Sequence, residues 1–424
     1  SDNVWPRTGT QALDVRSVAA FNVVFVPVHQ SANGLVGNVT PANLESNFVS
    51  MTRQIFPLAQ INASVRATYT TNAPALESND GNWAWLSVLS EMNSLRISEG
   101  SSANYYGVVN TSYGGGVAGY GYVPGRAAVG WDKVGTVARI TAHELGHNFG
   151  RSHVAACGPG NTDPNYPYAG GIISNFGWNA ATGALVPGST TDIMGYCGTQ
   201  WVSDYTWKNV MNYRGAGPAM GFMANATQPA LLVWGRIIDG VVTLEPAFRV
   251  VTRPVVADRP GAYRIELRDK TGRAITGFSF DPDDIDHNAN AQAFSFAVPL
   301  NSFAEVRLAS VAVIGGANGT TEQVARVAAA RMLGDPTPAP TMMATDDNSM
   351  QVTSPTPRLT RSGQLQRVTW DDEVWPVAMV RDAQTGQVLS YLRKSGDAFV
   401  PSSNRARVVF SNGVKTVTME LPIQ

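Results

Sequence analysis

The sequence predicts an α+β domain with a mixed, twisted sheet, followed by domains built only of β-strands. In the first part, short apolar runs with strand periodicity alternate with stretches whose apolar residues recur as on one face of a helix. From about Ala230 onward, short apolar runs are separated by turn residues, which is typical of antiparallel, immunoglobulin-like β-sandwiches. The expected domains are 1–215 for the α+β part, 216–335 for a β-sandwich, and 336–424 for a second sandwich or a continuation of the first.

The elements of the first domain are expected in the order strand, helix, strand, helix, strand. Thr40 and Pro41 suit the N-cap and the first position of the first helix. The second helix carries Trp85 and Leu89 on or near one face. The expected strands are 18–28, 61–71 and 105–110, and the expected helices are 41–55 and 82–97. A further helix is expected over 203–213, which would end the domain near Gly215.

A glycine-rich stretch, 113–122, follows the third expected strand. So many glycines do not suit a packed central strand, but they would allow another backbone to approach closely. A flexible surface loop is the alternative interpretation. The spacing is not a phosphate-binding fingerprint, because no strand–helix unit of the right order surrounds it.

One short segment carries the clearest chemistry. His143 and His147 are four residues apart, so on a helix they lie on one face and can share a metal ion. Gly150 can take the positive φ with which a chain leaves a helix, and the turn then brings back His153 as a third ligand. Three neutral imidazoles suit one Zn²⁺ ion and leave a fourth position for water, which Glu144 can deprotonate. A helix with a few surface histidines is the alternative, but three of only five histidines fall in this segment.

The pattern His-Glu-x-x-His-x-x-Gly-x-x-His resembles the long motif of the metzincin clan of zinc endopeptidases. Metzincins place a Met-turn beneath the zinc, and residues 192–197 (DIMGYC) supply one. The resemblance implies a metzincin catalytic domain with an active-site helix over 134–147, and Met194 as an apolar floor under the metal. It also implies that Tyr196 is a displaceable zinc ligand that stabilises the oxyanion. From the residues alone, Tyr196 can equally be a packing side chain.

The resemblance also gives a role to the glycine-rich stretch and to the two cysteines. In metzincins the segment before the active-site helix is an edge strand that pairs with an extended substrate. Cys157 and Cys197 lie on two segments that the metzincin fold brings together, so a disulfide is expected; two buried thiols in a reducing compartment are the alternative. The residues expected at the substrate-binding edge are Gly115, Gly116, Val117 and Ala118.

The trailing cysteine of the Met-turn and the segment 201–206 are similar to secreted bacterial reprolysin-like or mucin-cleaving metallopeptidases, although Ile193 stands where reprolysins usually have a cysteine. The implied function is a secreted zinc endopeptidase, which hydrolyses peptide bonds by Glu144-assisted attack of zinc-bound water. One alternative is a glycoprotein- or mucin-specific protease whose sandwiches bind glycan. Another is a binding or adhesion protein with an inactive zinc domain, against which the intact Glu144 argues. The candidate glycan-binding residues are Trp234, Trp370 and Trp375, although core tryptophans are commoner.

Charge and composition exclude several partners. The 31 basic residues nearly balance the 32 acidic ones, which gives no basis for binding nucleic acid or an anionic membrane surface. No apolar run reaches the length of a membrane span. We therefore expect a secreted or bacterial cell-surface monomer that acts on a protein or glycoprotein, with any signal or pro-segment already removed.

Three further features lie outside the motif. The acidic run Asp281, Asp283, Asp284 and Asp286 beside His287 could bind Ca²⁺, although a solvated loop is the commoner explanation. Residues 321–332 look helical, and a linker rich in Pro, Thr and Ala follows over 334–347. His29 is expected to be an ordinary structural histidine.

Overall fold

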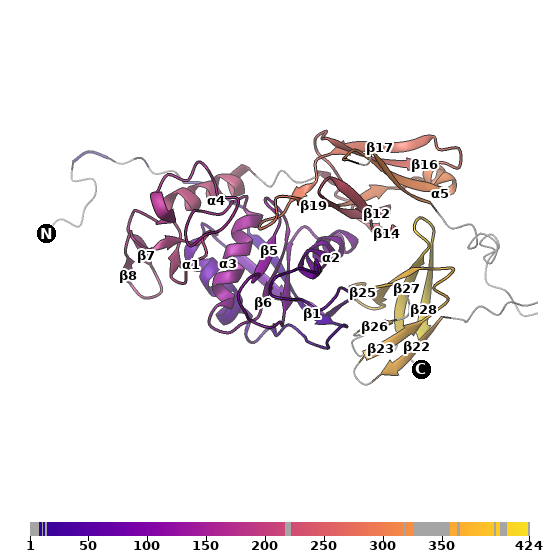
Figure 1. Ribbon diagram of the computed structural model, residues 1–424, viewed down its shortest axis with the longest axis horizontal. Helices are drawn as coiled ribbons and strands as arrows, with labels where there is room; N and C mark the ends of the chain where they lie inside the picture. Colours follow the sequence, from indigo (N-terminus) through magenta and orange to yellow (C-terminus); the bar gives the residue numbers. More distant parts are fainter. Residues whose placement is uncertain are drawn as a thin grey trace, which may run out of the picture.

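The computed structural model describes residues 8–10, 12, 15–216, 222–317, 319–324, 357–362, 365–393, 396–398 and 405–422. It has a mixed α/β part with one large mixed sheet, joined to several antiparallel β-sheets (Figure 1). The predicted change from mixed to all-β structure along the chain is therefore confirmed at this level. Among the described residues, no helix is both long and apolar enough to cross a membrane.

Strand β1 is the central strand of the N-terminal half of the large sheet. It pairs in parallel with β2, β3 and β4, and β6 continues the parallel order beyond β4. Strand β5 pairs antiparallel with β6 and ends the sheet, so the glycine-rich stretch does supply an edge strand. These strands are β1 (Phe21–Gln30), β2 (Ile61–Val65), β3 (Tyr69–Thr71), β4 (Asn104–Val109), β5 (Gly119–Gly121) and β6 (Ala127–Trp131).

The first expected helix begins later than predicted. Thr40 and Asn43 cap each other, because each side chain accepts a hydrogen bond from the other residue's backbone N–H. The chain then forms a π-helical turn, η1 (Leu44–Val49), which continues into α1 (Ser50–Ile55). The remaining helices of this part are α2 (Ala84–Ser98), α3 (Val137–Asn148) and α4 (Asp204–Ala216), with a short 3₁₀ turn, η2 (Ala169–Gly171).

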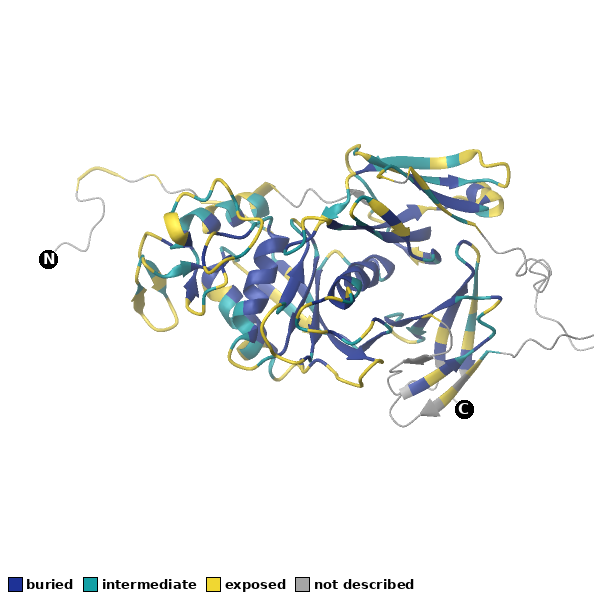
Figure 2. Cartoon of the chain, in the orientation of Figure 1, coloured by how far each residue is buried: buried dark blue, intermediate teal, exposed yellow. Residues whose placement is uncertain are grey.

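Helix α2 is buried on all sides rather than on one face. Every residue except Ser87 is buried, and Figure 2 shows the helix almost entirely dark blue. One side packs on the large sheet and the other packs on β12 (Gln228–Ile238) and β19 (Ala291–Pro299). Its second side is thus covered by a sheet that begins more than a hundred residues later in the chain. The all-β part is thereby fixed against the α/β part through one shared hydrophobic core.

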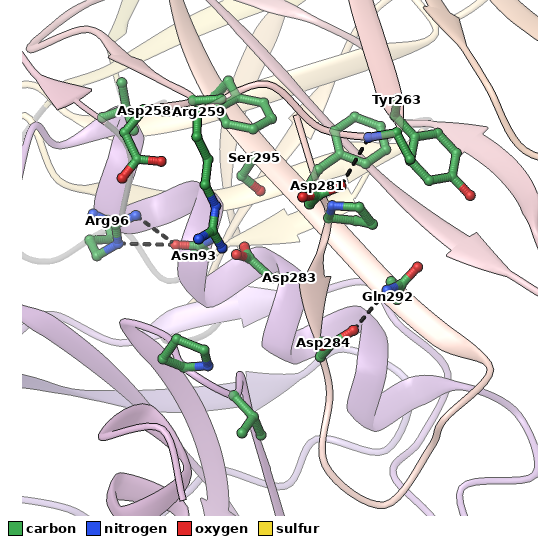
Figure 3. A pocket seen from close by; sticks show the side chains of 18 residues that line it. Asn93, Arg96, Asp258, Arg259, Tyr263, Asp281, Asp283, Asp284, Gln292 and Ser295 are labelled. Carbon is green, nitrogen blue, oxygen red and sulfur yellow. Dashed lines mark hydrogen bonds between the residues drawn. The ribbon is translucent and has the colours of Figure 1, made fainter. Parts of the chain in front are cut away.

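Two antiparallel sheets share a second core in the region 222–324. The larger has the order β11-β15-β19-β12-β13, with β14 beside β12 and β18 beside β19; the smaller has the order β17-β16-β20-β21. A cavity of about 530 Å³ separates α2 from part of this region (Figure 3). The other elements are β11 (Phe222–Met223), β13 (Val241–Leu244), β14 (Phe248–Thr252), β15 (Val255–Val256), β16 (Tyr263–Arg268), β17 (Ala274–Phe280), β18 (Asp283–Asp284), α5 (Ser302–Arg307), β20 (Ser310–Ile314) and β21 (Thr320–Val324).

Strand β21 shows that the helix predicted over 321–332 is wrong as far as Val324, because these residues extend the smaller sheet beside β20. The alternating pattern of exposed and half-buried residues in β21 is that of an edge strand. The rest of that predicted helix, the linker 334–347 and the predicted domain boundary at 335–336 lie outside the described residues.

The last strands of the chain return to the first domain. Four of them extend the large sheet in the order β28-β27-β24-β25, and β25 pairs with β3 where Ser390 lies opposite Thr70. Ser390 Oγ also donates a 2.8 Å hydrogen bond to the Thr70 carbonyl oxygen. These strands are β24 (Val377–Asp382), β25 (Val388–Arg393), β27 (Arg405–Ser411) and β28 (Thr416–Pro422); β22 (Arg358–Ser362), β23 (Leu365–Thr369) and β26 (Gly396–Ala398) form a separate three-stranded sheet.

Candidate metal centre

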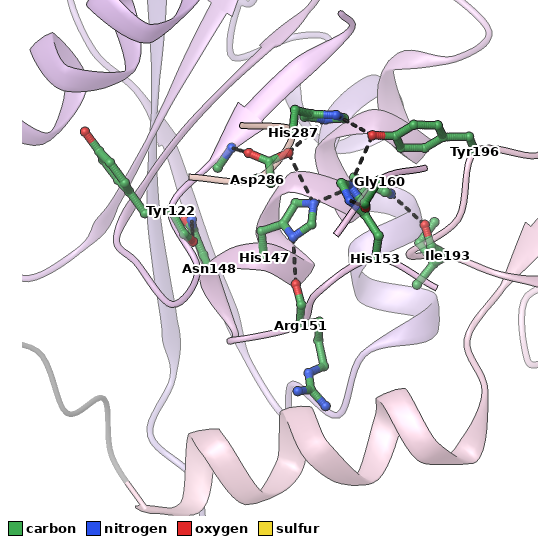
Figure 4. Close-up of polar contacts among 12 residues, drawn as sticks. Tyr122, His147, Asn148, Arg151, His153, Gly160, Ile193, Tyr196, Asp286 and His287 are labelled. Carbon is green, nitrogen blue, oxygen red and sulfur yellow. Dashed lines mark hydrogen bonds and ion pairs between the residues drawn. The ribbon is translucent and has the colours of Figure 1, made fainter. Parts of the chain in front are cut away.

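Helix α3 and the turn after it bring three histidines together (Figure 4). His143 and His147 lie one helical turn apart, and their Nε2 atoms are 3.2 Å from each other. Gly150 ends the helix with φ of +77°, which glycine adopts without strain. The chain then turns back, so that the His153 ring lies 4.7 Å from the His147 ring and 5.3 Å from the His143 ring.

Each of the three rings is oriented by a backbone carbonyl oxygen. A carbonyl oxygen only accepts hydrogen bonds, so each Nδ1 carries the proton and each Nε2 keeps a lone pair. All three lone pairs are thus available on the Nε2 side, where the rings converge. The pairs are His143 with Ile193 at 2.7 Å, His147 with Arg151 at 2.6 Å, and His153 with Gly160 at 3.1 Å.

The three imidazoles are suited to zinc in both charge and spacing. Burial lowers the pKa of His143 and His147 well below 6.5 and that of His153 to about 4, so all three are neutral at neutral pH. Bond lengths of 2.0–2.1 Å in a tetrahedral site imply about 3.3 Å between two ligand atoms. The 3.2 Å between the Nε2 atoms of His143 and His147 matches that spacing.

Glu144 lies between α3 and the edge strand. It is buried, and a Cβ atom added at Gly119 would lie only 2.6 Å from its Oε1, so only glycine leaves room for this carboxyl group. Its Oε2 is buried. Burial, and then the neighbouring Asp286 carboxylate, raise the pKa of Glu144 well above 4.5. A buried carboxyl group therefore lies on the same helix as His143 and His147.

Met194 packs directly beneath the helix that carries the histidines. It is fully buried, and a Cβ atom added at Gly146 would lie 2.5 Å from its sulfur. The turn is held by Asp192, whose carboxylate accepts hydrogen bonds from Met194 N–H at 2.9 Å and Ser203 N–H at 2.8 Å. Asp192 was missed by the sequence analysis, although an aspartate that accepts from the N–H two residues on is a known turn signal.

The disulfide between Cys157 and Cys197 is present, so this prediction is confirmed. It joins the segment after His153 to the end of the Met-turn, and the Tyr196 N–H donates a 2.9 Å hydrogen bond to the Ala156 carbonyl oxygen. Two covalently linked segments therefore set the position of the Tyr196 ring. Its phenol oxygen lies 3.3 Å from His153 Nε2 and also contacts His287 Nδ1 (Figure 4).

Asp286 and His287 enter the site from the loop between β18 and β19. Asp286 Oδ2 lies 3.3 Å from His147 Nε2 and 2.8 Å from His287 Nε2. The sequence analysis treated the acidic run beside His287 as a solvated loop that could bind Ca²⁺, but the acidic residues of that run point to different partners. Asp281 accepts from the Ala262 N–H and Asp284 accepts from the Gln292 side chain. The signal available in the sequence was the histidine itself, in a chain with only five.

The residues predicted to bind substrate lie just before the edge strand. The Val117 N–H donates to the Ser78 carbonyl oxygen at 2.6 Å, and the Ala118 carbonyl oxygen accepts from Trp131 N–H at 3.0 Å. Gly115 has no neighbour near its Cβ position, whereas Gly116, with φ of +114°, lies against Ser78. The ordered edge next to the histidines is therefore β5, which begins after the predicted residues 115–118.

A cavity of about 340 Å³ opens beside the histidines. His147 and His153 form one wall, and Asp284, Asp286 and Asn288 form another. The metal centre is therefore reached from a hollow that the all-β part of the chain partly closes.

No protein-family model and no curated protein matches this chain. The function must therefore be inferred from the chemistry of the site. That chemistry consists of three oriented neutral imidazoles, a buried carboxyl group beside them, and a phenol at their edge.

Proposed function

We propose that this chain is a secreted zinc-dependent endopeptidase with a metzincin-type catalytic domain and immunoglobulin-like β-sandwich modules. The observation that carries the proposal is the packing of the His143, His147 and His153 rings within 5.3 Å of one another, each with its Nδ1 held by a backbone carbonyl oxygen, on and just after the helix that carries the buried Glu144. A purely structural zinc site would have no use for this carboxyl group.

The donor set fits zinc better than the hard cations. Three imidazole nitrogens suit Zn²⁺, whereas Ca²⁺ and Mg²⁺ prefer oxygen ligands. A carboxyl oxygen of Glu144, one of Asp286 and a ring nitrogen of His287 lie within 4.8 Å of one another, which is consistent with a cation in this region. When bound, zinc would polarise a substrate carbonyl and lower the pKa of water to about 7.

Glu144 and Tyr196 supply the proton transfers and the hydrogen bond that peptide hydrolysis needs. Glu144 holds the attacking water, takes its proton and hands that proton to the departing amine. Burial, and then the carboxylates of Asp286 and Glu144, raise the pKa of Tyr196 above 10, so its phenol stays protonated. A protonated phenol can donate a hydrogen bond to the oxyanion of the tetrahedral intermediate.

Strand β5 is suited to hold an extended peptide. It is the edge of the large sheet, and an edge strand offers backbone N–H and C=O groups to an added strand. Gly119 and Gly121 leave no room for side chains between this strand and α3, because an added Cβ would meet Glu144 or His147. A peptide paired with β5 would thus pass next to Glu144.

Other residues bear on the compartment in which the protein acts and on its substrate specificity. The Cys157–Cys197 disulfide supports an oxidising compartment outside the cytoplasm. Of the tryptophans considered for glycan binding, Trp234 and Trp370 are buried in cores and Trp375 is half-buried. This favours a general endopeptidase over a glycan-dependent one.

The test compares the wild-type protein with Glu144→Gln and His153→Ala. Zinc content is measured first, and cleavage of unfolded casein is then followed over hours. We expect one zinc in the wild type and in Glu144→Gln, with casein cleavage at least about 10²-fold slower in the variant because general acid–base catalysis is lost. His153→Ala should lose zinc.

Glu77→Gln, at an exposed position of the same domain, is the matched control and should behave as the wild type. The proposal fails if the wild type binds no zinc, or if the wild type cleaves casein and Glu144→Gln cleaves it just as fast.

A further inference from the structure

We propose that the tip of the β18–β19 hairpin, residues 285–288, occupies the substrate cleft of its own chain and supplies Asp286 as a fourth metal ligand. The structure is then a closed, latent form of the enzyme, which becomes active when the tip is displaced. This inference rests on the proposed function, because latency has meaning only for a catalytic site.

The backbone of the hairpin takes the place along the edge strand that a substrate would need. Ile285 lies opposite Tyr122 as an antiparallel bridge, directly after β5. The Asp286 N–H donates to the Gly121 carbonyl oxygen at 3.2 Å, and the Val123 N–H donates to the Asp284 carbonyl oxygen at 3.0 Å. A peptide that adds to this edge requires the same backbone groups. Hairpin tip and substrate are therefore mutually exclusive.

The Asp286 side chain has the position and the environment of a metal ligand. Its Oδ1 accepts a 2.6 Å hydrogen bond from the Gly121 N–H, which fixes the carboxylate. Its Oδ2 is buried and lies 3.3 Å from His147 Nε2 and 2.8 Å from His287 Nε2. That distance equals the spacing of about 3.3 Å between two ligands of a tetrahedral zinc. Three imidazoles and this carboxylate would fill four positions and leave none for water.

His287 engages the phenol that catalysis would need. Its Nδ1 contacts the Tyr196 hydroxyl group, and its ring stacks on the Tyr196 ring with centroids 5.4 Å apart. His287 has φ of +61°, a left-handed conformation that is strained for a residue other than glycine. Such strain persists only where surrounding contacts hold it. In this chain the contacts with Tyr196 and Asp286 do so, and they also keep the phenol away from a substrate.

The tip can leave the cleft without unfolding the domain that carries it. Strand β19 is anchored on α2. The residues just before the tip, Pro282 and Asp283, instead line the 530 Å³ cavity together with Arg96 of α2 (Figure 3). The segment before the tip can therefore move toward this cavity. Ile285 is the one apolar anchor of the tip, being 5% exposed, while Ala289 and Asn290 are exposed. Displacement must break two backbone hydrogen bonds, the Gly121 N–H to Asp286 Oδ1 hydrogen bond, the Asp286–His147 ion pair and the His287–Tyr196 contact, and it must uncover the buried Ile285 and Asp286 side chains.

The experiment uses full-length protein loaded with Co²⁺ in place of zinc. Asp286→Ala removes the proposed ligand, and Asp286→Asn keeps its size and the Oδ1 acceptor. Asp281→Ala, in the same hairpin but away from the histidines, is the matched control. Three measurements are made on each protein: the visible absorption of Co²⁺, the affinity for acetohydroxamate, and the rate of cleavage of a fluorogenic peptide.

We expect both Asp286 variants to change the Co²⁺ spectrum, to bind acetohydroxamate at least about tenfold more tightly, and to cleave the peptide at least about tenfold faster. Acetohydroxamate can bind only to molecules whose hairpin tip has left the cleft, so its apparent affinity is the intrinsic affinity multiplied by the fraction of such molecules. Removing the Asp286 carboxylate should increase this fraction and therefore the apparent affinity. Asp281→Ala should match the wild type in all three measurements. If the wild type shows no detectable cleavage while the Asp286 variants cleave the peptide, that result also supports the inference.

Two results would overturn the inference. One is an unchanged Co²⁺ spectrum in both Asp286 variants, since Asp286 would then not be a ligand. The other is a changed spectrum with equal or weaker hydroxamate binding and equal or slower cleavage, since Asp286 would then belong to the working site. If hydroxamate binds more tightly but no variant cleaves any peptide, the occupied cleft stands and the proposed endopeptidase function fails.

Discussion

Asp192→Asn tests whether the Met-turn determines the orientation of His143, one of the three proposed zinc ligands. The fully buried carboxylate accepts one hydrogen bond through each oxygen, from Met194 N–H and from Ser203 N–H. An asparagine of the same size can accept only one of them and turns its NH₂ group toward the other donor. One buried N–H then loses its partner, which lowers the free energy of unfolding by roughly 1–3 kcal/mol. The same turn carries the Ile193 carbonyl oxygen that orients His143, so zinc affinity should fall by about 10–100-fold.

Both effects can be measured on one set of samples. Urea unfolding of the metal-free protein gives the stability change, and competition with a chromogenic chelator gives the zinc affinity. Glu77→Gln, at an exposed position of the same domain, should change stability by less than about 0.5 kcal/mol and leave zinc affinity unchanged. Unchanged zinc affinity in Asp192→Asn, together with the expected loss of stability, would refute the link between the Met-turn and His143.

Three further predictions concern other parts of the molecule. Replacing both Cys157 and Cys197 by serine should lower the free energy of unfolding by about 4 kcal/mol in denaturant titrations, because the bond closes a loop spanning 40 residues. Gly119→Ala places a Cβ atom 2.6 Å from Glu144 Oε1, so it should retain zinc but slow peptide cleavage by about 10²-fold relative to Gly115→Ala, whose Cβ meets nothing. Burial raises the pKa of Glu91 from 4.5 to about 7, so the folded chain binds this proton more tightly than the unfolded chain does. The stability of the wild type should therefore fall by about 3 kcal/mol more than that of Glu91→Gln as pH rises from 4.5 to 7.

The parts of the site that are close in sequence could be predicted from sequence. His143, His147 and His153 lie within one helix and the turn after it, and helical periodicity and the conformation of Gly150 determine their geometry. The disulfide, which links segments 40 residues apart, was expected only because a family resemblance placed those segments together. Local sequence rules were therefore sufficient to predict the arrangement of the three histidines but not the disulfide.

The contributions of distant segments could not be predicted. Asp286 meets Gly121 across 165 positions of sequence, and nothing in the acidic run distinguishes this residue from Asp284. For α2, a helical pattern with apolar residues near one face gave no sign that β12 and β19 would cover the opposite face. The pairing of Ser390 with Thr70 likewise depends on how the whole chain folds back. In each case tertiary packing decided what local periodicity left open.

A crystal structure of the zinc-loaded wild type, with anomalous data collected at the zinc edge, tests the central claim most directly. We predict one anomalous peak bonded at about 2.0–2.1 Å to the Nε2 atoms of His143, His147 and His153 and at about 2.0–2.2 Å to Asp286 Oδ2. The hairpin tip should still lie along β5. A peak bound elsewhere, or none at the three histidines, would contradict the metal centre itself. A peak held by the three histidines with a water in place of Asp286 would contradict the latent form alone.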